Sequence, residues 1–99
     1  MMIPKRFELG DRTYTVRMLP TMNKHGVMGA TYFQAARIEI GKKSKRTGVA
    51  YRQEEVNETF WHELTHAILN DMGSSLDRDE EFVTQFASRL AQAVSTAKL

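Results

Sequence analysis

The sequence predicts an α+β fold, in which a small, mostly antiparallel β-sheet precedes two antiparallel helices. Two observations lead to this prediction. Short apolar–polar alternation broken by turn residues fills the first half of the chain, whereas apolar residues at helical spacing fill the second half. The chain has 99 residues, 41% of them hydrophobic, which suits a single domain. We divide residues 1–99 into a sheet region, 1–50, and a two-helix region, 51–99.

The sheet region contains four candidate strands. The segment RTYTVRML alternates with a period of two, and RFEL precedes it. Gly10 and Asp11 stand between these segments and are typical of a hairpin turn. The segments ATYF and RIEI supply two more strands, joined by a turn near residues 34–36. We expect loops at TMNKHGVMG and at the basic segment GKKSKRTGV, residues 41–49.

The second half predicts two helices. The first should span residues 52 to about 72 and end at Gly73. The second should span about 77–97, where Asp77 and Glu80 have the spacing of a capping box. The linker GSSLD is short, so the helices should be antiparallel neighbours. The expected apolar faces are Val56, Phe60, Leu64, Ala67 and Ile68 in the first helix, and Phe82, Val83, Phe86, Ala87, Leu90 and Val94 in the second.

Composition excludes several classes of protein. The formal net charge of +2, from 14 Lys plus Arg against 12 Asp plus Glu, is too small to indicate nucleic-acid binding by itself. The sequence has no cysteine, which excludes disulfides, thiolate metal sites and a cysteine nucleophile. No apolar run approaches the roughly 20 residues that span a bilayer. Pro4 and Glu8 interrupt the region where a signal peptide is apolar, so we expect a cytoplasmic protein.

The pentapeptide HELTH, residues 62–66, contains candidate metal ligands and a candidate base. On a helix, His62 and His66 lie one turn apart on the same face, so both imidazoles can reach one metal ion. Glu63 projects beside them, where its carboxylate can meet a water molecule bound to the same ion. Two nitrogen ligands, an open coordination position and a carboxylate base are what metal-assisted hydrolysis requires.

A catalytic zinc site usually has a third protein ligand. No histidine follows His66, and the only other one, His25, lies on a distant loop. The acidic segment DRDEEF at the start of the second helix therefore supplies the candidates. Glu80 lies at the border of the apolar face and is our choice, whereas Glu81 lies on the solvent side and remains the alternative. These acids could instead only cap the helix and interact with its dipole.

A sheet followed by the HELTH helix and by a second helix with an early glutamate resembles the zincin metallopeptidases, in particular the gluzincins. HELTH is similar to the active-site segment of thermolysin-like enzymes, and the chain size resembles compact phage- or prophage-encoded zincin-like proteins and the minimal domain of the ImmA/IrrE group. The resemblance covers about residues 55–94. It implies that His62, His66 and Glu80 bind Zn²⁺, that Glu63 is the general base, and that the protein acts in a bacterial host cytoplasm if phage-encoded.

The predicted function is therefore zinc-dependent hydrolysis of a peptide or protein substrate, extended along the sheet edge beside ATYF or RIEI. Tyr32, Tyr51 and His25 are candidates for assisting the tetrahedral intermediate. One alternative is a zinc-containing, non-catalytic binding or regulatory module of a phage or prophage. Another is an interaction protein that uses the basic loop, but no aromatic residue interleaves its basic run, so we expect no specific nucleic-acid binding. The basic residues of this run are Lys42, Lys43, Lys45 and Arg46.

Overall fold

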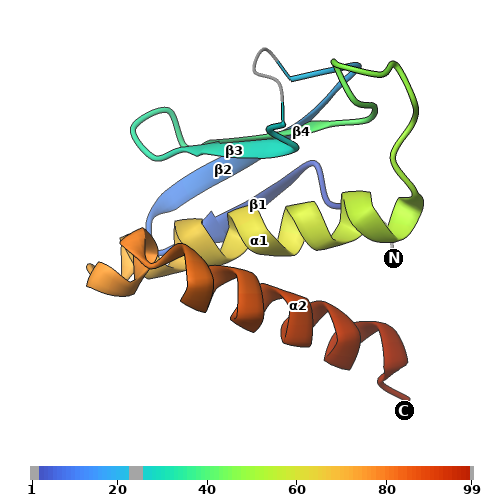
Figure 1. Cartoon of the computed structure of the whole chain (residues 1–99). Coiled ribbons are helices and arrows are strands. Elements are labelled where there is room, and N and C mark those ends of the chain that lie inside the picture. The colour runs from blue at the N-terminus through green and yellow to red at the C-terminus, as the bar shows by residue number, and fades with distance from the viewer. Residues whose placement is uncertain (1–2, 23–25, 99) are drawn as a thin grey trace.

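A computed structural model describes residues 3–22 and 26–98. Four strands precede two α-helices, which confirms the α+β class, and a short 3₁₀ helix lies between the two α-helices (Figure 1). The elements are β1 (Arg6–Leu9), β2 (Arg12–Leu19), β3 (Gly29–Tyr32), β4 (Arg37–Gly41), α1 (Gln53–Asp71), η1 (Ser75–Arg78) and α2 (Glu80–Thr96).

The strands form one sheet in the order β1-β2-β4-β3. The hairpin between β1 and β2 turns at Gly10, whose φ of 60° is the left-handed conformation that glycine adopts without strain. β3 pairs antiparallel with β4, as expected, but β2 pairs parallel with β4. The sheet is therefore mixed, and β3 is an edge strand whereas β4 lies inside the sheet.

Helix α1 lies between the sheet and α2, so the molecule has three layers (Figure 1). On the sheet side, Val56 and Phe60 of α1 pack in a core with Tyr14, Ile38 and Ile40 of the strands. Burial on both sides explains why residues of α1 outside the predicted stripe, such as Thr65, are also buried. The layered arrangement places α1, the helix that carries HELTH, between the sheet and α2.

The start of α2 differs from the prediction. Asp79, not Asp77, is the N-cap residue, and its carboxylate accepts a hydrogen bond from the backbone N–H of Phe82 at 3.0 Å. The predicted capping box of Asp77 and Glu80 is therefore wrong. A turn of 3₁₀ helix, capped by Ser74, takes up residues 75–78 and leaves both acidic side chains for other contacts.

The predicted apolar face of α2 is only partly covered. Val83 and Ala87 are buried against α1, but Phe86 and Val94 are 47% and 45% exposed. α2 has α1 on one side and no sheet behind it, and it diverges from α1 toward its C-terminal end (Figure 1). Within α2, the buried residues of the apolar face are therefore limited to the N-terminal half of the helix. Among the described residues, neither helix is both long and apolar enough to cross a membrane.

Candidate metal centre

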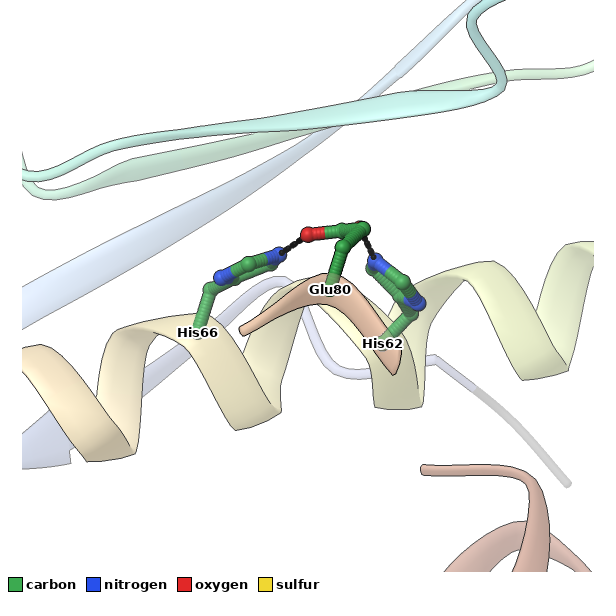
Figure 2. A group of neighbouring side chains, drawn as sticks. All are labelled: His62, His66 and Glu80. Carbon is green, nitrogen blue, oxygen red and sulfur yellow. Dashed lines mark hydrogen bonds and ion pairs between the residues drawn. The ribbon is translucent and has the colours of Figure 1, made fainter. Parts of the chain in front are cut away.

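Helix α1 fixes the two histidines of HELTH side by side. His62 and His66 are one helical turn apart, with ring centroids 5.1 Å from each other and ring planes at 64°. Their side chains are 23% and 15% exposed, so each ring is mostly covered. The spacing predicted from sequence is thus realised as two neighbouring imidazoles on the face of α1 that meets the start of α2 (Figure 2).

Glu80, the first residue of α2, bridges the two rings. Its Oε1 lies 2.6 Å from His62 Nε2, and its Oε2 lies 3.1 Å from His66 Nε2 (Figure 2). Glu80 reaches them because the 3₁₀ turn brings the chain back over α1 just before α2 begins. One ligand atom from each of the three residues lies within 4.8 Å of the others, so the group could hold a metal ion.

The neighbouring acids of α2 have other partners. Asp79 caps the helix, and Glu81 accepts a hydrogen bond from the side-chain amide of Gln85 at 3.4 Å. Successive helical residues point about 100° apart, so Glu80 and Glu81 cannot both face α1. The structure brings Glu80 to the histidines and leaves Glu81 on the exposed side of α2.

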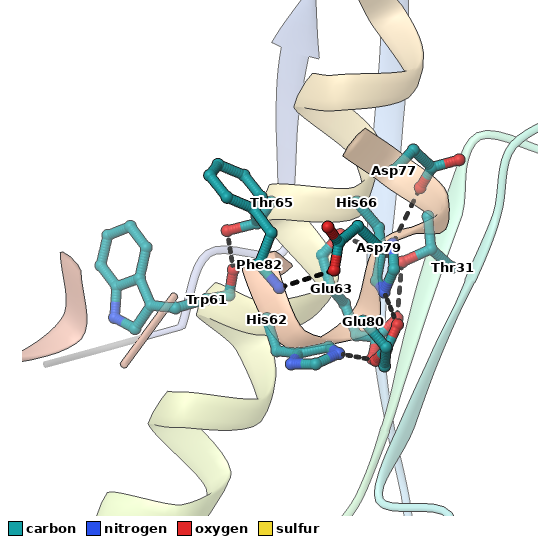
Figure 3. Close-up of polar contacts among 10 residues, drawn as sticks. All are labelled: Thr31, Trp61, His62, Glu63, Thr65, His66, Asp77, Asp79, Glu80 and Phe82. Carbon is teal, nitrogen blue, oxygen red and sulfur yellow. Dashed lines mark hydrogen bonds and ion pairs between the residues drawn. The ribbon is translucent and has the colours of Figure 1, made fainter. Parts of the chain in front are cut away.

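Asp77, which we expected to cap α2, is the second partner of His66. Its Oδ1 lies 2.8 Å from His66 Nδ1, and both side chains are about 15% exposed (Figure 3). A carboxylate that accepts the Nδ1–H of a histidine fixes the ring orientation and leaves Nε2 as the ligand atom. This contact was missed from sequence, where only the position of Asp77 between the helices could have suggested it.

Glu63 is the buried carboxylate of the site, with only 8% of the residue exposed. The hydroxyl of Thr31 on β3 lies 2.7 Å from its Oε1 and donates a hydrogen bond to it (Figure 3). Burial raises the pKa of Glu63 above its ordinary value, against the lowering effects of the Thr31 hydroxyl and of the two histidines; the Glu80 charge adds to the rise. Glu63 is therefore a buried carboxylate with a raised pKa, whereas the Glu80 side chain is 66% exposed.

A cleft of about 520 Å³ opens between the start of β3 and α1, directly beside these groups. Close approach of strand and helix is possible because β3 begins with a glycine: a Cβ at Gly29 would lie 2.7 Å from Thr59 Cγ2 and 3.2 Å from Glu63 Cγ. The cleft opens onto the side chains of His62, Glu63 and Glu80. Its lining residues are Gly26, Val27, Met28, Gly29, Glu55, Glu58, Thr59, His62, Glu63 and Glu80.

The candidates for an assisting side chain are not brought to the cleft within the described part of the chain. Tyr32 is 42% exposed and packs under the guanidinium of Arg37, and Tyr51 packs against the hydrophobic core. His25 lies outside the described residues.

The basic loop is exposed over much of its length and forms a turn, which is closed by a hydrogen bond from the Ser44 N–H to the Val49 carbonyl.

The donor set could hold a metal ion. Two imidazole nitrogens and one carboxylate oxygen converge, and a second carboxylate orients one of the rings. The donor atoms come from His62 and His66 on α1 and from Glu80 at the start of α2, and Glu63 of α1 lies next to them (Figure 3). Comparisons of this chain with protein-family models, curated proteins and solved structures give no match.

Proposed function

We propose that this chain is a zinc-dependent metallopeptidase of the gluzincin type. The observation that carries the proposal is the arrangement of a possible metal triad, His62, His66 and Glu80, beside a buried carboxylate and an open cleft. A metal-binding group alone would support only a binding protein. The separate carboxylate, which the triad does not use, supports hydrolysis.

Zinc is the proposed metal because its usual ligands are imidazole nitrogens and carboxylate oxygens, with three protein ligands and one open position in catalytic sites. Bound there, it would polarise a peptide carbonyl and lower the pKa of a water molecule. His62 and His66 would bind through Nε2, the atoms that face Glu80 in the structure. Asp77 would keep His66 in that orientation.

Glu63 is proposed as the general base. A base works best when its pKa lies close to the working pH, and burial moves the Glu63 carboxyl in that direction. It would take a proton from the attacking water and pass it to the leaving amine. The side chain lines the cleft, so the proton has a short path to a substrate held there.

The proposed substrate is an extended peptide beside β3. Of the two segments considered from sequence, ATYF forms most of the edge strand, whereas RIEI lies in β4 between two neighbours. Only an edge strand offers backbone groups for pairing with a further strand. A peptide added to β3 would run along the cleft and pass next to the metal triad.

The test combines zinc content with turnover of a peptide library. Wild-type protein should bind about one zinc per chain and cleave peptides, whereas Glu63→Gln should keep the zinc and lose at least about 100-fold in kcat, because an amide accepts no proton. Glu54→Gln, on an exposed position of the same helix, is the control and should behave as wild type. Zinc binding without turnover by the wild type would instead support the non-catalytic metal module.

A further inference from the structure

Thr31 joins the edge strand to the buried carboxylate. Its hydroxyl lies 2.7 Å from Glu63 Oε1 and 3.0 Å from the backbone carbonyl oxygen of Glu63, although the two residues are 32 positions apart. Thr31 stands at the third position of β3, on the same face of the strand as Gly29, which also approaches Glu63. The contact is part-buried and lies between strand and helix (Figure 3).

The hydrogen bond from Thr31 restrains the flexible side chain of Glu63 by holding its Oε1 atom. A glutamate has three side-chain torsions, and a base displaced by about 1 Å loses much of its effect. With Oε1 engaged by the hydroxyl, Oε2 is left to accept a proton. Among the described residues, Thr31 makes the only side-chain hydrogen bond recorded to this carboxylate. A hydrogen bond to a charged oxygen is also stronger than one between neutral groups.

We propose that Thr31 is a positioning residue, whose hydroxyl holds Glu63 Oε1 and thereby aims Oε2 at the attacking water. This inference rests on the proposed peptidase function and deepens it. β3 would pair with the substrate and also holds the base through Thr31, so one strand would fix the positions of both. The close contact of Gly29 with α1 sets the distance between strand and helix at that point.

The test uses Thr31→Val, which keeps the shape but removes the hydroxyl, and Thr31→Ser, which restores it. In the zinc-loaded protein, Thr31→Val should lower kcat by about 10- to 100-fold and leave KM within about threefold, because orientation rather than binding is lost. Thr31→Ser should recover kcat to within about threefold of wild type. The control is Thr13→Val, the same substitution at an exposed position of β2.

Crystal structures of the metal-free proteins provide a readout that does not depend on activity. The Glu63 carboxylate should keep its place in wild type and Thr31→Ser, and should move or occupy several positions in Thr31→Val. Wild-type kcat in Thr31→Val, or an unmoved carboxylate in its crystal structure, would overturn the proposal. No turnover by the wild type would overturn the peptidase function instead, and the crystal structures would then decide the role of Thr31 alone.

Discussion

Replacing Asp77 with asparagine tests whether a side chain outside the proposed metal triad supports zinc binding. The asparagine has nearly the same shape, so its side-chain oxygen can still accept a hydrogen bond from His66 Nδ1. What it lacks is the negative charge that makes this contact charge-assisted. The 2.8 Å distance between Asp77 Oδ1 and His66 Nδ1 falls in the range of such strong contacts.

The expected loss of zinc affinity follows from the contact and its burial. Removal of a carboxylate that supports a ligand histidine typically costs about 10- to 100-fold in metal affinity. Asp77 and His66 are about 15% exposed, so water screens the interaction only partly. We therefore expect a loss near the middle of this range, about 30-fold, which corresponds to about 2 kcal/mol.

Competition with a chromophoric chelator measures the zinc Kd of each variant. The matched control is Asp79→Asn, which removes the same charge two residues away but touches no histidine. Asparagine and aspartate are equally good N-cap residues, so α2 should keep its stability in this control. A Kd for Asp77→Asn within twofold of wild type would refute the supporting role. Equal losses in both variants would show a general charge effect instead.

Three further predictions concern the same region. Glu80→Ala should weaken zinc binding by about 100-fold or more, and Glu81→Ala by less than about twofold; the reverse order would move the third ligand to Glu81. Gly29→Ala should lower the free energy of unfolding by about 1–3 kcal/mol in denaturant titrations, because the added Cβ would lie 2.7 Å from Thr59 Cγ2, and an unchanged midpoint would contradict this. Zinc affinity should fall at acidic pH, because an imidazole nitrogen that carries a proton cannot bind the metal. Chelator competition over a pH series measures this change, and a zinc Kd that does not depend on pH would argue against binding through His62 and His66.

Local sequence patterns predicted the elements of the fold, but they did not predict how segments far apart in the chain pair and pack. Period-two alternation placed the strands, and the hairpin at Gly10 followed from its turn residues. Alternation shows which face of a strand is buried but not the direction of its neighbour, so the parallel pairing of β2 with β4 was not predicted. Likewise, the apolar residues of α2 marked a face, but not how far that face would be covered, and Phe86 remained exposed.

The candidate site likewise contains residues that local geometry predicts and contacts that depend on tertiary packing. His62 and His66 follow from helical geometry alone, since residues four apart share a face. Glu80 needed one further step, its orientation on α2. Asp77 was assigned to a helix cap, and its contact with His66 depends on a 3₁₀ turn that the sequence pattern did not indicate. The hydrogen bond from Thr31 depends on how closely β3 packs against α1, which no local pattern contains.

The two glutamates of the site differ in environment, and that difference agrees with the roles proposed for them, without reference to the motif. The Glu80 side chain is 66% exposed and touches both imidazoles, so it can bind a metal ion without first leaving a buried position. Glu63 is buried between β3 and α1, where desolvation raises the pKa of its carboxyl. An accessible acid that contacts two imidazoles suits a metal ligand, whereas a buried acid with a raised pKa suits proton transfer. Exchanging the roles would require Glu63 to give up its hydrogen bond from Thr31 and Glu80 to leave its contacts with both imidazoles.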